Sequence, residues 1–310
     1  MPLHGLTHVV IGVPNVVETA AYYEEFGLAP DATAEAASFS TLDGGQQLSL
    51  VPAATRRLVE LGVAADDVDD LALISGRLST IGLPVVEHTP GEILAHEPVA
   101  RFAVRIRIAE RVVQEPAVRT PYNGPGRADR AGRAPGILRQ ERVRPRKLGH
   151  AVVGTTHLES TMRFFVEGLG FKVSDYIGDK GAFMRCSTDH HNVLALAAPV
   201  NFLHHTSWQV DDVDDVGRGA TTMLEDHPER HVWGLGRHHA GSNFFWYLKD
   251  PAGNFCEYYS DMDCVPEDAL WTPEAVEGAK GLYGWGPPPP PSFLAPEDLA
   301  ALMTGAHSPG

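Results

Sequence analysis

The chain has 310 residues, of which 43% are hydrophobic and 21% charged, and its formal net charge is -15 at pH 7. This composition is typical of an ordinary globular protein, and the length allows two domains. The acidic balance argues against a nucleic-acid partner, because phosphates require a basic surface. No segment approaches the roughly 18 consecutive apolar residues of a membrane helix, so we expect no membrane partner.

The first residues and the cysteine content both bear on the cellular compartment. Residues 1–5 lack the basic start and the apolar run of a signal peptide. The 3 cysteines, Cys186, Cys256 and Cys264, are too few for a disulfide framework and suit a reducing environment. These features predict a cytoplasmic protein.

Strands and helices are predicted to alternate in a pattern that occurs four times along the chain. Short apolar segments predict the strand that opens each unit, at residues 9–13, 58–63, 151–153 and 206–210. A short acidic turn and a helix follow, as in residues 162–169, where apolar side chains recur three or four positions apart. Further strands complete each unit. The chain therefore reads as four βαβββ units in tandem.

The second half of the chain repeats the first half, and such a repeat decides the architecture. The aligned pairs are residues 6–28 with 148–170, residues 66–71 with 211–216, and, without a gap, residues 102–115 with 244–257. Two copies of one module of two units each are predicted, which gives an α+β fold.

Two segments depart from this pattern. Residues 121–147 are rich in Pro, Gly and Arg and predict a mobile connection, whose arginines could bind an anion or the acidic neighbouring surface. Residues 287–291 are consecutive prolines that favour polyproline II, and a short helix is expected near residues 296–303. The aromatic residues around them favour an arm packed on its own domain over an arm that recruits a partner. The expected boundaries are 1–120 and 148–262 for the modules, 121–147 for the connection and 263–310 for the arm.

His150, His205 and Glu257 are the candidate metal ligands. They fall on the first strand of the third unit and on the first and last strands of the fourth. Two imidazoles and one carboxylate leave about half of an octahedral metal's positions open, as in non-haem Fe(II) oxygenases. His204 competes with His205, because neighbouring residues on a regular strand face opposite sides.

Several short motifs occur together in the order expected for one family. They are Gly-His-Ala-Val at 149–152, His-His-Asn at 190–192, Leu-His-His at 203–205, Gly-Arg-His at 236–238 and Asp-Pro-x-Gly-Asn-x-x-Glu-Tyr at 250–258. Over residues 1–262 the chain resembles the two-domain (type I) extradiol ring-cleaving dioxygenases of the vicinal oxygen chelate superfamily. The resemblance implies that each module is an open, cup-shaped mixed β-sheet with flanking helices.

The resemblance also implies an activity. It is the Fe(II)-dependent cleavage of a catechol ring by O₂ to a hydroxymuconate-type semialdehyde or ketone, with Mn(II) as the other possible metal. The Leu-His-His motif assigns the metal to His205, with His150 and Glu257, and leaves His204 beside the site. A homo-oligomer is expected. Whether the catechol is monocyclic, bicyclic or a product of secondary metabolism stays open.

Three further residues are implied to take part in catalysis. His191 corresponds to the family's acid–base group, and histidine suits that role because it titrates near neutral pH. His238 and Tyr247 correspond to donors of hydrogen bonds to bound oxygen or substrate, with His239 as the alternative to His238. Many relatives carry Asn two residues after this His, where this chain has Ala240.

The first module carries a partial counterpart of the same set. His8, Glu60 and Glu115 fall at the repeat positions of the three candidate ligands under the alignment above. The resemblance implies a first domain without metal, and Glu115 lacks the Asp-Pro-x-Gly turn that precedes Glu257.

Two other functions share this fold. A metal-dependent isomerase or lyase of the glyoxalase type draws its ligands from two modules, and a ligand-sequestering protein of the antibiotic-resistance type has a metal-free cleft. A ligand set inside the second module, together with His191, favours the dioxygenase.

Overall fold

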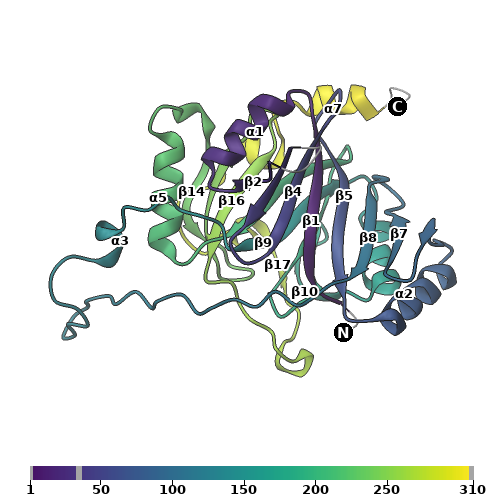
Figure 1. The fold of residues 1–310 in the computed structure, drawn as a ribbon, viewed down its shortest axis with the longest axis horizontal. Helices are drawn as coiled ribbons and strands as arrows, with labels where there is room; N and C mark the ends of the chain where they lie inside the picture. Colours follow the sequence, from purple (N-terminus) through teal and green to yellow (C-terminus); the bar gives the residue numbers. More distant parts are fainter. Residues whose placement is uncertain (1–2, 33–36, 307–310) are drawn as a thin grey trace.

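The computed structural model describes residues 3–32 and 37–306, and it contains the four predicted βαβββ units (Figure 1). The first unit consists of β1 (Leu3–Val13), α1 (Val16–Glu25), β2 (Ala29–Pro30), β3 (Ala37–Thr41) and β4 (Gly45–Pro52). The second consists of β5 (Arg57–Ala65), α2 (Val68–Thr80), β6 (Glu87–His88), β7 (Glu92–His96) and β8 (Ala103–Ile108).

The third unit consists of β9 (Lys147–Thr155), α4 (Leu158–Arg163) with a π-helical continuation η1 (Phe164–Leu169), β10 (Lys172–Ile177), β11 (Gly181–Arg185) and β12 (Val193–Ala197). The fourth consists of β13 (Phe202–Gln209), α5 (Val213–Leu224), the 3-10 turn η2 (Pro228–Arg230), β14 (His231–Arg237), β15 (Phe244–Lys249) and β16 (Phe255–Ser260). The elements outside the units are α3 (Pro135–Leu138), η3 (Asp268–Leu270), β17 (Ala275–Val276), η4 (Gly278–Gly281), α6 (Pro291–Leu294) and α7 (Leu299–Ala306).

Each pair of units forms one mixed sheet. The strand orders are β2-β3-β4-β1-β5-β8-β7-β6 and β14-β15-β16-β13-β9-β12-β11-β10-β17. The two opening strands of a module pair antiparallel at the centre, and the closing strand of each unit lies parallel to an opening strand. The α+β prediction with four units in two modules is confirmed.

The repeated acidic turns begin helices α2 and α5. Asp67 accepts hydrogen bonds from the backbone N–H groups of Asp69 and Asp70, at 2.9 and 3.0 Å, and Asp212 accepts one from Asp215 at 3.1 Å. A carboxylate at this position satisfies amides that have no partner within the helix, and it favours the positive end of the helix dipole. The motif is therefore a helix start.

The gapless alignment of residues 102–115 with residues 244–257 is wrong. Strand β8 lies parallel to β5, as β16 lies parallel to β13, so residues 103–108 correspond to the last strand and not to β15. Successive side chains face opposite sides in every strand, and this period of two cannot tell neighbouring strands of one sheet apart. Arg105 opposite Gly62 therefore takes the place that Glu257 takes opposite Ser207, and Glu115 lies beyond the last strand of the first module.

The connection between the modules extends from the end of β8 to the start of β9, and it loops away from the body of the molecule (Figure 1). Arg139 pairs with Asp212 at 2.7 Å and Asp215 at 2.8 Å, and Arg146 pairs with Asp43 at 2.5 Å. Of the two roles considered for its arginines, these contacts are with the acidic neighbouring surface.

The arm that follows β16 packs on its own module. Strand β17 pairs with β10, and Phe293 of α6 is buried against Trp233 and Tyr247. Pro290 has the dihedral angles of polyproline II, φ -68° and ψ 152°, before α6 begins. None of the described helices is long and apolar enough to span a membrane.

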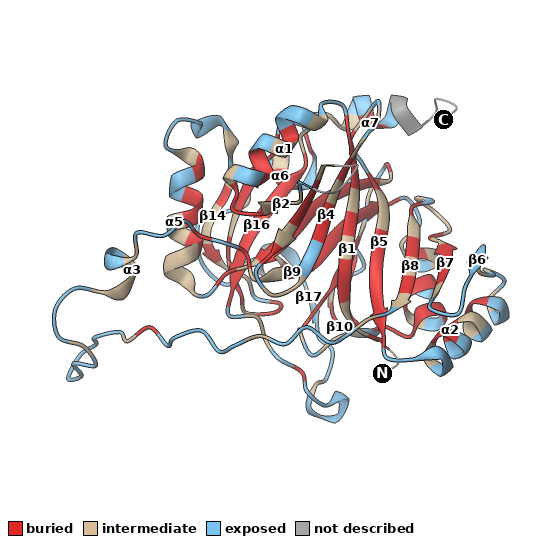
Figure 2. Cartoon of the chain, viewed as in Figure 1, coloured by how far each residue is buried: buried red, intermediate tan, exposed pale blue. Residues whose placement is uncertain are grey.

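The two modules share one hydrophobic core, and buried residues follow the central strands of both sheets (Figure 2). Phe26, at the end of α1, stacks on Tyr258 of β16 with ring centroids 3.9 Å apart. The Tyr258 hydroxyl donates a 2.6 Å hydrogen bond to the Phe26 carbonyl. This contact joins the first module to the strand that carries Glu257.

Replacing Phe26 with Ala is expected to lower the free energy of unfolding by about 3–5 kcal/mol, because it leaves a cavity beside a fully buried ring. Urea unfolding followed by circular dichroism measures the change. Val17→Ala on the same helix, where the side chain is 81% exposed, should stay within about 0.5 kcal/mol of the wild type. A Phe26→Ala variant as stable as Val17→Ala would show that this stack does not hold the modules together.

Candidate metal centre

Three adjacent central strands bring the candidate ligands together. Ser207 on β13 lies opposite His150 of β9 on one side and opposite Glu257 of β16 on the other. His205 precedes Ser207 by two positions and therefore shares its face of the sheet. The pairing of β13 with both neighbours thus places three side chains from distant parts of the sequence around one point.

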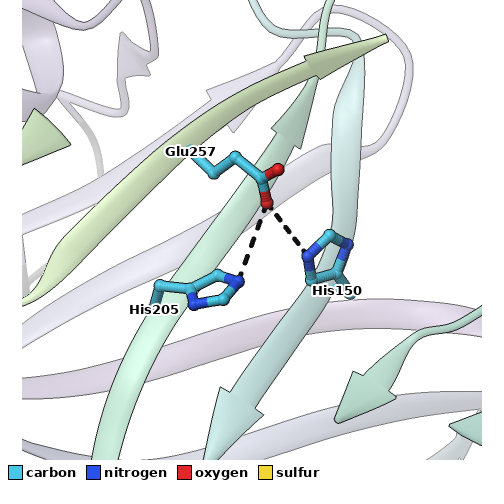
Figure 3. Close-up of side chains that lie close together, drawn as sticks. All are labelled: His150, His205 and Glu257. Atoms are coloured by element: carbon cyan, nitrogen blue, oxygen red, sulfur yellow. Dashed lines mark ion pairs between the residues drawn. The ribbon is translucent and has the colours of Figure 1, made fainter. Parts of the chain in front are cut away.

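The three side chains point toward one another (Figure 3). The Glu257 Oε2 atom lies 3.1 Å from His150 Nε2 and 3.7 Å from His205 Nε2. One ligand atom from each residue falls within 4.8 Å of the others, and all three residues are buried. The structure thus brings together the three residues that the sequence singled out as metal ligands.

Unpaired polar atoms identify what this cluster requires. His205 Nε2 and Glu257 Oε2 are buried and make no well-aligned hydrogen bond among the described residues, although the His150 imidazole lies 3.1 Å from Glu257 Oε2. A buried carboxylate oxygen without a partner is strongly unfavourable unless a cation or a donor compensates it. Two imidazole nitrogens and one carboxylate suit a divalent transition metal. The residues therefore fit such an ion.

His204 adjoins the site because the strand is irregular. The register of β13 with β9 shifts between Leu203 and His205, and both histidines line the same cavity. The expectation that they face opposite sides is wrong, because a bulge interrupts the alternation. His204 Nε2 donates to the Phe293 carbonyl at 2.5 Å, so its Nδ1 accepts from His205 Nδ1 at 2.7 Å. These bonds leave the lone pair of His205 on Nε2, directed at the cluster.

Glu257 also has partners on its other oxygen. Asn243 donates to Oε1 at 3.2 Å, and His238 Nε2 lies 3.5 Å from the same atom. Burial alone raises the pKa of Glu257, but the nearby imidazoles of His150 and His238 outweigh it and hold that pKa well below its usual value. Sequence reasoning missed the role of Asn243; its only signal was its closeness to Ala240, where relatives carry Asn.

His238 and Tyr247 form a pair at the edge of the cluster. His238 Nδ1 donates to the Leu282 carbonyl, so its Nε2 accepts from the Tyr247 hydroxyl at 2.9 Å. Burial and the nearby Glu257 raise the pKa of Tyr247, which keeps its hydroxyl protonated. The alternative residue, His239, is exposed, whereas His238 lines the cavity.

His191 packs beside His150 at the cavity wall. Its ring centroid is 4.2 Å from that of His150 and 4.9 Å from that of Phe183. Burial and the neighbouring His150 and His190 rings lower the pKa of His191 well below its usual value. The side chain is therefore a neutral imidazole at the cavity wall.

The cavity beside the cluster is lined by polar and by apolar side chains. The polar ones are the five histidines His150, His191, His204, His205 and His238, together with Tyr247. The apolar ones are Val152, Ile177, Phe183, Leu194, Leu196, Ala240, Leu282, Phe293 and Leu294. None of the described residues that line it is a lysine or an arginine. This lining suits a small, uncharged molecule that has both an apolar part and polar atoms.

This fold and this cluster define a known class of protein. Residues 147–258 match the family model of the Glyoxalase/Bleomycin resistance protein/Dioxygenase superfamily, and they form a domain of that superfamily. The resemblance to the vicinal oxygen chelate superfamily predicted from the sequence is confirmed.

The individual relatives are more specific. The chain is 28% identical to "Metapyrocatechase 2" of Cupriavidus necator, over 94% of this chain and 92% of the relative. It is 26% identical to a "Manganese-dependent 2,3-dihydroxybiphenyl 1,2-dioxygenase" of Geobacillus genomosp. 3, over 77% and 79% of the two chains. The predicted enzyme class, extradiol ring-cleaving dioxygenases, is confirmed by these relatives.

One solved structure is described differently. The Mn(II)-bound glyoxalase from Novosphingobium aromaticivorans superposes with a TM-score of 0.75 at 27% identity, over 94% of each chain. The agreement extends over both modules, which confirms the architecture.

The first module has a counterpart of the cluster in which the side chains are bonded to one another. His8 Nε2 lies 3.0 Å from Glu60 Oε1, and Arg105 Nε donates to the same carboxylate at 2.8 Å. Burial alone raises the pKa of Glu60, but the hydrogen bonds from His8 and Arg105 outweigh it and lower that pKa to about 2. The guanidinium thus supplies the positive charge that a metal ion would supply in the second module.

Replacing Glu60 with Gln is expected to lower the free energy of unfolding at pH 7 by about 1 kcal/mol, after allowance for solvent screening. A depressed carboxyl pKa stabilises the fold above the unfolded value near 4.5, and this contribution is lost as the pH falls toward about 2. The difference between the variant and the wild type should therefore narrow below pH 4.5 in urea unfolding series. A constant difference from pH 7 to pH 3 would contradict the charge interaction, and Glu87→Gln, a more exposed partner of Arg105, is the control.

Proposed function

We propose that this chain is a divalent-metal-dependent extradiol dioxygenase that uses O₂ to cleave the ring of an uncharged catechol. The observation that carries the proposal is the buried cluster of His150, His205 and Glu257, whose two histidines line a cavity with many apolar side chains. The dioxygenase names of relatives that match most of the chain support it.

Fe(II) is the proposed metal, with Mn(II) as the alternative that the names of two similar proteins suggest. When bound by the three ligands, the ion supplies Lewis acidity and a path for electrons from the catechol to O₂. Two neutral imidazoles and one carboxylate would leave a net charge of about +1 at the site, which favours a deprotonated phenol.

The surrounding residues would orient the substrate and handle its protons. Tyr247 keeps a protonated hydroxyl close to Glu257, and His238 holds that hydroxyl by accepting its hydrogen bond. His191 is a neutral imidazole at the wall, within reach of a hydroxyl held at the cluster. It would accept a proton from the substrate and return it later in the cycle.

The apolar side chains that line the cavity limit the substituents of the ring. A carboxylate buried against Ile177, Leu196 and Leu294 would have no cationic partner among the described lining residues. An unpaired charge in such surroundings is unfavourable by several kcal/mol. A catechol with a hydrogen or a small alkyl substituent is therefore the substrate class that this wall fits.

The glyoxalase-type isomerase is the second candidate, because one similar structure is described as a glyoxalase. Such enzymes typically take ligands from two modules. Here the candidate ligands all lie in the second module, and Arg105 stands at the position in the first module where a third ligand would lie. A metal-free sequestering protein would have no use for three ligand-type side chains gathered at one point. For this chain we also propose a cytoplasmic location and a homo-oligomeric state.

Metal binding gives the first test. The protein purified without oxygen should hold about one Fe(II), or Mn(II), per chain. His205→Ala should lose the ion, whereas His204→Ala should keep it with an affinity about 10–100-fold weaker, because His204 acts only through its bond to His205. Metal analysis by mass spectrometry measures both, with the exposed residue His231→Ala as control. Loss of metal in the His204 variant together with retention in the His205 variant would reverse the two roles.

The reaction gives the second test. The metal-loaded protein, supplied with ¹⁸O₂ and a panel of catechols, should form yellow ring-fission products that contain both oxygen atoms. Catechol and alkylcatechols should react with kcat/KM at least about 100-fold higher than catechols that bear a carboxylate, because a buried unpaired charge is so unfavourable.

Three other results would count against this reading. A colourless muconic diacid would indicate cleavage between the hydroxyls. No consumption of any catechol, with conversion of a glyoxalase-type substrate, would favour the isomerase. Preference for carboxylated catechols would refute the substrate class while leaving the reaction intact.

A further inference from the structure

A second pair of adjacent histidines lies behind the cavity wall. His190 Nδ1 is 3.0 Å from His191 Nδ1, and His190 Nε2 is 3.0 Å from Asp175 Oδ2 on strand β10. All three residues are buried. The hydrogen bonds form one chain from a carboxylate to the imidazole that borders the cavity.

The donor and acceptor properties of these groups fix the direction of the hydrogen bonds between them. An ionised carboxylate only accepts hydrogen bonds, so His190 Nε2 carries the hydrogen that faces Asp175. With its hydrogen on Nε2, the His190 ring has its lone pair on Nδ1, which accepts the 3.0 Å hydrogen bond from His191 Nδ1. His191 is therefore left with a lone pair on Nε2, the ring nitrogen that is not used in this chain.

The arm holds the carboxylate in place. The backbone N–H of Glu274 donates to Asp175 Oδ1 at 2.8 Å, and Trp271 packs edge-on against the His190 ring at 5.1 Å. Trp271 is fixed in turn by a 2.8 Å hydrogen bond from Nε1 to the Ser174 carbonyl. The two oxygens of Asp175 thus have separate partners.

The other histidine pair has the same design. His204 uses the Phe293 carbonyl as its acceptor and thereby sets the lone pair of His205 toward the metal cluster. In each pair the outer histidine has an acceptor that cannot donate, and the inner histidine presents Nε2 on the far side. A buried hydrogen bond to one ring nitrogen is the usual means of fixing which tautomer a functional histidine adopts.

We infer that Asp175 and His190 are positioning residues that fix His191 in the tautomer whose Nε2 lone pair is free toward the cavity. This nitrogen can accept a proton from a bound substrate before it donates one. The catalytic consequence rests on the proposed function, but the tautomer itself does not.

Asp175→Asn tests the inference, because it should reverse the direction of the hydrogen bonds that link residue 175 to His190 and His191. The Glu274 N–H requires an acceptor at Oδ1, so the amide nitrogen of the variant must take the Oδ2 position and donate to His190 Nε2. His190 would then donate from Nδ1, and His191 would carry its hydrogen on Nε2. Asp175→Glu keeps a carboxylate and should preserve the wild-type tautomer.

The measurement is ¹⁵N NMR of the full-length, metal-free protein labelled with ¹⁵N-histidine, with the His191 signals assigned through His191→Gln. We expect an unprotonated His191 Nε2 in the wild type and a protonated one in Asp175→Asn. Ser174→Ala is the control, since it removes the buried hydrogen bond of the neighbouring side chain to Arg185 and should not alter the tautomer. The same tautomer in the wild type and in Asp175→Asn would overturn the inference.

Turnover gives an independent measurement. Asp175→Asn should lower kcat about 10–100-fold, the usual effect of losing a residue that orients a functional group, with KM and metal content unchanged. Asp175→Glu should recover part of this loss, and Ser174→Ala should match the wild type. Full activity in Asp175→Asn despite a reversed tautomer would overturn the catalytic part. A wild type that cleaves no catechol would refute the proposed function, and the NMR result would still decide the tautomer.

Discussion

The pairing of β13 with β9 on one side and β16 on the other is the constraint on which the site depends. Because Ser207 faces both His150 and Glu257, any shift of one residue in either register would turn a ligand to the other face of the sheet. The shared core and the Phe26–Tyr258 stack support this register through packing of the first module against the second. The position of the cluster is thus a property of the sheet, and loops have little part in it.

The arm supplies contacts that orient the histidines of the site, which the sheet alone does not provide. Phe293 lines the cavity and orients His204, while Glu274 and Trp271 support Asp175 and His190. Both inner histidines are therefore oriented through residues that follow the last strand of the second module. His205 lies on β13 and His191 lies in the loop between β11 and β12, so one arm controls the hydrogen bonding of two histidine pairs from different parts of the sequence.

Patterns within single segments were enough to predict the units, the repeat and the three candidate ligands. Period and composition act locally, and the motif around Glu257 is long enough to fix its position. The place of Arg105 was missed because a gapless alignment cannot distinguish two neighbouring strands of the same period. The bulge at His204 and the contacts of Asn243 and Asp175 depend on packing between distant segments, which a single sequence does not display.

The arm also has a consequence for the order in which the site is built. Synthesis proceeds from the N-terminus, and domains fold as they emerge from the ribosome. His150, His205 and Glu257 are all translated before Phe293. The hydrogen bond from His204 to the Phe293 carbonyl is therefore completed only after the three candidate ligands have been made. The orientation of His205 depends on a segment that is synthesised after the last strand of its own module.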